Sequence, residues 1–167
     1  LTANILPPNR KIASFQKSLA GYADSGVDAF IMSDPGMIRF VRTEFPEIPI
    51  HLSVQTNTMN WSSAAFWQDQ GVKRIILSRE LSLDEILEIH KRVPDLELEA
   101  FVHGSICIAY SGRCLLSNYF NHRDANQGTC TNSCRWEYNV YKANDSAGKT
   151  FDSIEENSPF YIEEQNR

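Results

Sequence analysis

The chain has 167 residues, of which 42% are hydrophobic, and a formal net charge of −5. This length allows one domain with a substantial core. No apolar run reaches the roughly 18 residues of a membrane-spanning helix, which excludes that class. The first eight residues lack the basic and apolar regions of a signal peptide, so we expect a cytoplasmic protein. The sequence starts with Leu1 rather than Met, inside an expected strand, so we also expect a piece of a longer chain.

The first hundred residues alternate predicted strands with predicted helices. The strands are apolar runs of the kind that is buried on both faces of a sheet, and they are expected at 1–5, 27–32, 48–54, 72–77 and 96–102. The helices are expected at 9–23, 34–45, 60–70 and 82–93. In the first helix, Ile12, Phe15, Leu19 and Tyr22 fall on one face, which predicts that this face packs on the sheet.

Local chemistry sets the helix ends. Asp34 followed by Pro35 gives an N-cap and a favoured first-turn proline. Asn60 is a second N-cap, and Gly71 is a C-terminal stop for the same helix. In the last helix Ser82 and Glu85 form a capping box, and Leu81 can pack on Ile86.

Alternation at this spacing predicts parallel strands joined by right-handed helical crossovers. A (β/α)8 barrel and an open doubly wound sheet both fit. No G-x-G-x-x-G motif follows a strand, which argues against a dinucleotide-binding sheet. Five strands cannot close an eight-stranded barrel. We therefore predict an α/β fold, a (β/α)8 TIM-barrel-like domain of which this chain is a fragment.

Three regions are expected along the chain. Residues 1–104 are the barrel strand–helix units. Residues 105–141 are a cysteine-rich loop region of the same domain, with a short helix or strand within 109–120 and a strand near 135–141. Residues 142–167 are a polar acidic tail or connector that could include a short strand at 160–162.

The four cysteines all lie in the cysteine-rich region, at Cys107, Cys114, Cys130 and Cys134. Three interpretations compete. The first is a metal or iron–sulfur site, because four thiolates close a Cys₄ site around zinc or a cluster. The spacings C-x6-C, C-x15-C and C-x3-C are not those of zinc ribbons or ferredoxins. The second is a Cys107 nucleophile with His103 as base, and the third is a structural role for the thiols.

Polar side chains follow the predicted strands, where active sites of parallel α/β barrels lie. Each has an alternative. Asp34 could serve only as a helix cap, Arg79 and Glu80 could pair with each other, and His103 could be a core histidine. The full set is Asn4, Ser33, Asp34, Gln55, Asn57, Ser78, Arg79, Glu80 and His103.

The cysteine-rich region is also locally positive. Its charged residues include Arg113, Arg123 and Arg135, against Asp124 alone among acids between residues 103 and 136. Chance and attraction of an anionic partner are both compatible with this. The aromatic residues there could stack on bases, although packing of the loop is the favoured interpretation: Tyr110, Tyr119, Phe120, Trp136 and Tyr138.

The segment 99–117, EAFVHGSICIAYSGRCLLS, resembles the signature of the collagenase-like peptidase family U32, of unassigned catalytic type. The matching positions are Glu99, Phe101, Gly104, Ser105, Ile106, Cys107, Gly112, Cys114, Leu116 and Ser117. Segments 31–36, 51–55, 76–82 and 126–138 extend the resemblance, and they are most similar to the tRNA hydroxylation branch of that family.

The resemblance implies two activities. One is 5-hydroxylation of tRNA wobble uridine, with a [4Fe–4S] cluster on Cys107, Cys114, Cys130 and either Cys134 or a residue outside the fragment. In that case prephenate is the co-substrate, zinc is the alternative metal, and tRNA and a small dicarboxylate donor are the partners. The other activity is a peptidase acting on protein. In the first case, the catalytic face is expected to hold Asp34, Arg79, Glu80 and His103, and Arg113, Arg123 and Arg135 are expected to bind phosphates or the donor.

Overall fold

The structure is a computed structural model that describes residues 1–104, 106–142 and 160–164, with side chains described up to residue 137. Ser105 and residues 143–159 lie outside the described residues. The chain divides into two units, residues 1–131 and residues 132–167.

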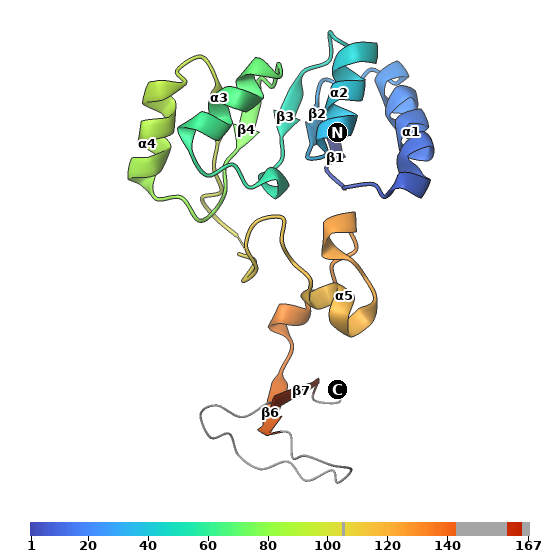
Figure 1. Ribbon diagram of the computed structural model, residues 1–167, viewed down its shortest axis with the longest axis vertical. Coiled ribbons are helices and arrows are strands. Elements are labelled where there is room, and N and C mark those ends of the chain that lie inside the picture. Colours follow the sequence, from blue (N-terminus) through green and yellow to red (C-terminus); the bar gives the residue numbers. More distant parts are fainter. Residues whose placement is uncertain (105, 143–159, 165–167) are drawn as a thin grey trace. The chain divides into compact units, whose positions relative to one another are not determined.

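The first unit contains a parallel sheet of five strands in the order β1-β2-β3-β4-β5 (Figure 1). The strands are β1 (Thr2–Ala3), β2 (Phe30–Met32), β3 (Ile50–Leu52), β4 (Arg74–Ile76) and β5 (Glu97–Glu99). The helices between them are α1 (Ile12–Asp24), α2 (Pro35–Glu44), α3 (Trp61–Asp69) and α4 (Leu83–Arg92). The α/β prediction is confirmed, with strands shorter than expected.

The strand order distinguishes the predicted barrel from the doubly wound sheet that the strand spacing also allowed. A doubly wound sheet reverses its strand order at a switch point, whereas every described neighbour here is the next strand in the chain. Right-handed crossovers between consecutive neighbours place successive helices on the same face of the sheet. This arrangement is that of one part of a (β/α) barrel.

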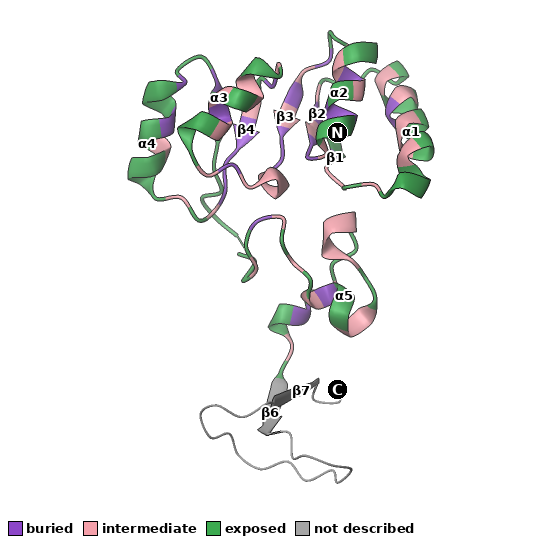
Figure 2. Ribbon diagram, in the orientation of Figure 1, coloured by how far each residue is buried: buried purple, intermediate pink, exposed green. Residues whose placement is uncertain are grey.

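The core lies between the sheet and the helices (Figure 2). Phe30, Met32, Ile50 and Leu52 point from the strands into it and are fully buried. Burying one such side chain stabilises the fold by about 1.5–3 kcal/mol. The helix residues of this core include Leu19, Met37, Ile38, Val41, Ala64 and Ile89. Tyr22, expected on the packed face of α1, is instead 47% exposed.

The opposite face of the sheet carries a polar row. His51 on β3 pairs in register with Arg74 on β4, and Arg74 pairs with Glu97 on β5. The Arg74 guanidinium lies 2.6 Å from the Glu97 carboxylate and 3.8 Å from that of Glu99. Because side chains alternate across a strand, this row explains why β5 is more exposed than the other strands.

The predicted helix ends are confirmed. The Asp34 carboxylate accepts a hydrogen bond from the Met37 amide, and Asn60 caps α3 in the same way. Ser82 and Glu85 form the expected capping box. Gly71 follows α3 with a positive φ of 82°, which a residue with a side chain adopts only with strain.

The cysteine-rich region contains mostly short elements. In the first unit these are α5 (Leu116–Asn121) and the 3₁₀ turn η3 (Ala125–Gln127). A further 3₁₀ turn, η2 (Val54–Thr56), lies outside this region and follows β3. The second unit contains η4 (Ser133–Arg135) and an antiparallel pair, β6 (Tyr138–Lys142) and β7 (Phe160–Glu164). None of the helices in the described residues is both long and apolar enough to cross a membrane.

Candidate functional site

Polar side chains from three strands meet at the carboxyl edge of the sheet. The Asn4 side-chain amide, after β1, donates to the Ser53 hydroxyl after β3 at 3.2 Å. The Asn57 amide donates to the Ser78 hydroxyl after β4 at 3.3 Å. Ser53 and Ser78 are both buried. Asn4, Asn57 and Ser78, which were expected at strand ends, therefore lie along this edge, because parallel strands place their carboxyl ends together.

Two atoms of this edge lack a hydrogen-bond partner among the described residues. They are the Ser33 hydroxyl, after β2, and the side-chain oxygen of Gln55, in the turn η2. A buried polar group without a partner costs about 1–3 kcal/mol. Such atoms mark the edge as a place that a polar ligand or water can complete.

Asp34 has a structural role that the sequence offered as one alternative. Its carboxylate lies 3.0 Å from the Met37 amide at the start of α2. An N-cap of this kind contributes about 1 kcal/mol. One carboxylate oxygen is thus committed to the helix, and a role for Asp34 toward a substrate remains a prediction.

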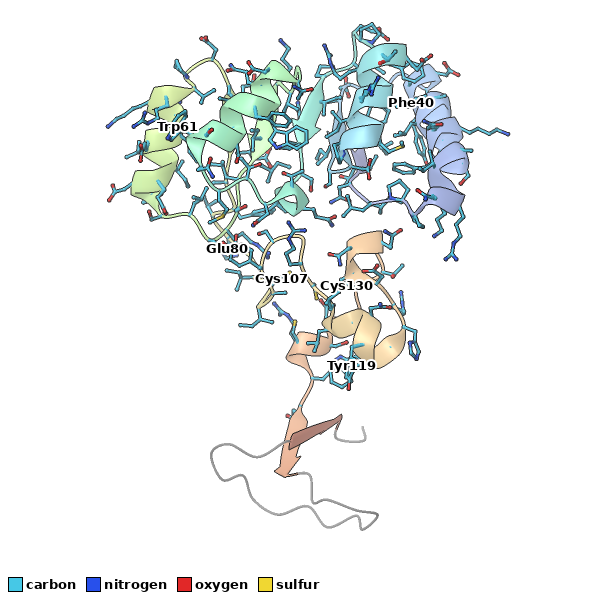
Figure 3. All side chains as sticks on the ribbon, viewed as in Figure 1. Phe40, Trp61, Glu80, Cys107, Tyr119 and Cys130 are labelled. Carbon is cyan, nitrogen blue, oxygen red and sulfur yellow. The ribbon has the colours of Figure 1, made fainter. Side chains whose placement is uncertain are left out.

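Arg79 and Glu80 both contact the cysteine-rich region through Ser111. The Ser111 amide donates to Glu80 at 2.9 Å, and the Ser111 hydroxyl donates to the same carboxylate at 3.1 Å. The Arg79 guanidinium donates to that hydroxyl at 3.2 Å. Ser111 is completely buried, whereas Glu80 is exposed. Figure 3 labels Glu80 and, on the loop that it contacts, Cys107. We call Arg79, Glu80 and Ser111 the Ser111 latch.

The latch also sets the ionisation of Glu80. Its limited burial alone would raise the pKa of the carboxyl group. The hydrogen bonds from Ser111 and the positive charge of Arg79 outweigh that effect and lower the pKa. Glu80 is therefore an anion that accepts hydrogen bonds, the form that the latch requires.

Two further contacts tie the region after β5 to the sheet. Gly112 has a φ of 71°, and a Cβ added there would overlap the backbone carbonyl of Gln55. The Gln127 side-chain amide donates to the carbonyl of Leu6, which follows β1. The loop thus approaches the carboxyl edge at β1, β3 and β4.

The cysteines expected as ligands lie in this docked region and just beyond it. Cys107 and Cys130 are exposed and Cys114 is half-buried. The Cys114 carbonyl accepts a hydrogen bond from Asn126 at 2.8 Å. Cys134 is exposed and belongs to the second unit.

A second network holds the chain next to Cys130. The Thr131 amide donates to the Ser117 hydroxyl at 3.0 Å, and the Asn121 side-chain amide donates to the Thr131 hydroxyl at 3.1 Å. Ser117 is buried. The start of α5 is thereby fixed against the segment that carries Cys130.

The donor set fits a thiolate-bound metal group in its chemistry. Cys107, Cys114 and Cys134 are free thiols, and thiolates are the ligands that iron–sulfur clusters and zinc prefer. Among the described residues, no three His, Cys, Asp or Glu side chains are close enough together to hold a metal ion. Binding would therefore have to draw the cysteine side chains together.

The remaining predicted site residues are exposed to solvent. His103, Arg113 and Arg123 are exposed in the first unit, and Arg135 is exposed in the second. No hydrogen bond joins His103 to Cys107 among the described residues. The favoured packing interpretation fails for Tyr110 and Tyr119, whose side chains are 51% and 78% exposed.

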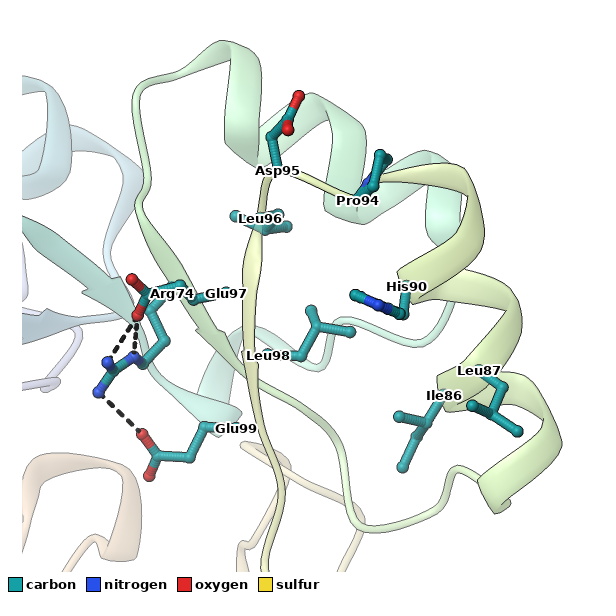
Figure 4. A pocket seen from close by; sticks show the side chains of 10 residues that line it. All are labelled: Arg74, Ile86, Leu87, His90, Pro94, Asp95, Leu96, Glu97, Leu98 and Glu99. Carbon is teal, nitrogen blue, oxygen red and sulfur yellow. Dashed lines mark hydrogen bonds and ion pairs between the residues drawn. The ribbon is translucent and has the colours of Figure 1, made fainter.

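A pocket lies beside α4 and β5 rather than at the carboxyl edge (Figure 4). Its lining includes Ile86, His90 and Leu98 together with the Arg74–Glu97 ion pair. None of the predicted site residues lines this pocket. Its lining combines apolar side chains of α4 and β5 with the charged side chains of Arg74, Asp95, Glu97 and Glu99.

Sequence reasoning missed the residues that dock the loop. Ser111 was not singled out as a site residue, nor were Asn126, Ser117 and Thr131 as supports of the cysteines. The available signal was Gly112, which stands between Cys107 and Cys114 beside a serine. A glycine in a tight approach to another backbone is a recognisable pattern.

Comparison with known proteins identifies the family. Residues 1–165 match the sequence pattern of the family described as "Peptidase family U32". The chain is 61% identical over 140 residues to "tRNA hydroxylation protein P" of Escherichia coli (strain K12), covering 84% of this chain and 31% of that protein. It is 35% identical over 140 residues to "23S rRNA 5-hydroxycytidine C2501 synthase" of the same strain, covering 84% of this chain and 21% of that protein.

A solved structure, "The Structure of the U32 Peptidase Mk0906", is similar with a TM-score of 0.50 at 20% identity. The similarity covers 59% of this chain and 43% of that chain, and it supports the fold alone. The chain spans less than a third of the length of either curated relative named above. The match over nearly all its residues shows that the chain belongs to peptidase family U32, and the identities place it in the tRNA hydroxylation branch expected from its motifs.

Proposed function

We propose that the protein takes part in RNA hydroxylation, and that its substrate is the wobble uridine of tRNA, modified at carbon 5. The observation that carries this proposal is the 61% identity to a protein named for tRNA hydroxylation. The relative named for 5-hydroxycytidine synthesis in 23S rRNA supports the broader class of RNA hydroxylation.

The segment of the cysteine-rich region that carries Cys107 and Cys114, called the cysteine loop below, supports the position of the proposed active site. It docks at the carboxyl edge of the sheet, where parallel α/β barrels carry their active sites. Cys107, Cys114 and Cys130, with Cys134 or a residue outside this chain, would hold a [4Fe–4S] cluster, with zinc as the alternative metal. A bound cluster would supply electron-transfer or Lewis-acid chemistry beside that edge.

The chain's own residues would bind and orient the RNA. The amide and hydroxyl groups of Asn4, Gln55, Asn57 and Ser33 offer uncharged donors and acceptors of the kind that recognise base edges. Exposed Tyr110 offers a stacking surface. The side chains of Arg113, Arg123 and Arg135 would bind phosphates or a dicarboxylate donor such as prephenate, because guanidinium groups match both anions.

The test is replacement of Cys107 or Cys114 by serine in the protein expressed in a strain that lacks its own copy. We expect loss of bound iron and loss of 5-hydroxyuridine-type nucleosides in digested tRNA, measured by mass spectrometry. Glu88→Gln, on the exposed side of α4, is the control and should retain both. Normal iron content and normal nucleosides in both cysteine variants would refute the proposal.

A peptidase is the second candidate, because family U32 is named for that activity and the Cys107 thiol is exposed. It requires a thiolate attack on a peptide bond with His103 as base. It predicts metal-independent cleavage of protein that Cys107→Ser abolishes. Cleavage that persists in Cys107→Ser would exclude this candidate.

A further inference from the structure

The Ser111 latch joins the end of β4 to the loop that carries Cys107 and Cys114. It places two charged side chains from the end of β4 on one buried serine more than 30 positions later in the chain. Ser111 lies between Cys107 and Cys114, so the latch holds the middle of the segment that carries both thiols. An exposed loop held by its centre keeps its two flanks at a fixed place on the sheet edge.

The geometry of the latch is fully satisfied. The Ser111 hydroxyl donates to Glu80 and accepts from Arg79, while its amide donates to the other Glu80 oxygen. Charge-assisted hydrogen bonds of this kind are stronger than neutral ones. Next to it, Gly112 lies directly on the backbone of Gln55. Together, the Ser111 and Gly112 contacts fix the position of the loop on the carboxyl edge between β3 and β4.

We propose that Glu80 is a positioning residue, which acts through Ser111 to hold the loop between Cys107 and Cys114 at the carboxyl edge of the sheet, the place from which both thiols would close on a metal group. The metal part of this inference rests on the proposed function, whereas the latch itself does not. Glu80 was expected to face the substrate. Its hydrogen bonds in the structure are instead to the loop that bears the thiols.

The first experiment uses the metal-free protein, so that it does not depend on a cluster. Hydrogen exchange of peptides covering 108–114 and the rate of Cys114 alkylation by iodoacetamide are measured by mass spectrometry. Glu80→Ala should increase both, because Ser111 loses its acceptor. Glu80→Gln should stay near wild type, because its side-chain oxygen can still accept from the Ser111 amide. Glu88→Ala, which removes a carboxylate from the exposed face of α4, should change neither.

The second experiment measures iron retention against a chelator after reconstitution with iron and sulfide. Residues that orient ligands typically change metal affinity by about ten-fold or more, and we expect that loss in Glu80→Ala and a smaller one in Glu80→Gln. Ser111→Ala should behave as Glu80→Ala does, which keeps the test decisive if one variant folds poorly. Circular dichroism of each variant checks that the sheet and helices persist.

The outcomes separate the latch from the proposed function. Unchanged exchange and alkylation in Glu80→Ala and Ser111→Ala would overturn the latch. A normal latch in Glu80→Gln together with lost nucleoside modification would overturn the positioning role of Glu80, because that pattern assigns Glu80 to the substrate. Increased exchange in Glu80→Ala, with no iron bound even by wild type, would support the latch and refute the cluster.

Discussion

Replacing Gly112 by alanine should detach the cysteine loop from the sheet without unfolding the sheet. The glycine has a φ of 71°, and a residue with a Cβ in this left-handed region costs about 1–2 kcal/mol. The added Cβ would also overlap the backbone of Gln55, which cannot rotate away as a flexible side chain could. The left-handed penalty alone shifts the docking equilibrium by about 5–30-fold.

The assay is hydrogen exchange of the segment around Ser111, with urea unfolding of the whole chain measured alongside. The matched control is Gly26→Ala, because Gly26 has a similar φ of 78° but no atom within 4 Å of an added Cβ. The control should lower the free energy of unfolding by the same left-handed penalty of about 1–2 kcal/mol and leave exchange near Ser111 unchanged. Unchanged exchange in Gly112→Ala would refute the assignment of Gly112 as a close contact that docks the loop.

Three further predictions concern groups whose partners are defined. Asp34→Ala should lower the free energy of unfolding by about 0.5–2 kcal/mol through loss of the α2 N-cap, and Asp34→Asn should restore it in urea titrations; an equal loss in both would contradict the capping role. Burial and then the charge of Arg74 lower the pKa of His51, so its NMR titration should have a midpoint below 6.5. As pH falls, the unfolded chain binds a proton at His51 before the folded chain does. The stability contributed by neutral His51 is therefore complete above pH 6.5 and is lost as pH falls through the folded pKa. This pH dependence of the free energy of unfolding should be absent in His51→Asn. The amide and hydroxyl of Ser82 lower the pKa of Glu85 from 4.5, so that the capping box is complete above 4.5 and is lost as pH falls through the lowered pKa. Ser82→Ala removes the hydroxyl and keeps the amide, so the Glu85 midpoint should rise part of the way toward 4.5; a midpoint equal to that of the wild type would contradict this.

The strand–helix repeat could be predicted from the sequence because its signals are local. Asp34, Asn60 and Ser82 each satisfy backbone amides within three residues of themselves, so each helix start is encoded where it occurs. The spacing of the strands alone fits both a barrel and a doubly wound sheet. The absence of a G-x-G-x-x-G motif after any strand favoured the barrel, and the consecutive order of the strands agrees with that prediction.

The site was predictable in part. The strand-end residues were expected at one edge because parallel strands require it, and the Asn4–Ser53 and Asn57–Ser78 contacts confirm that they meet there. The partner of Glu80 was not predictable, because Ser111 lies far along the chain in a region without periodicity. Only tertiary structure brings these two together.

We have proposed that the cysteine loop of this protein holds an iron–sulfur cluster beside the strand ends. The most direct measurement is anaerobic purification followed by iron and sulfide assays and an absorption spectrum. We predict a brown protein with about four irons per chain and a broad band near roughly 400 nm, as expected for a thiolate-bound [4Fe–4S] cluster. A colourless protein without iron or zinc, but with reactive thiols, would contradict the claim and favour the cysteine peptidase.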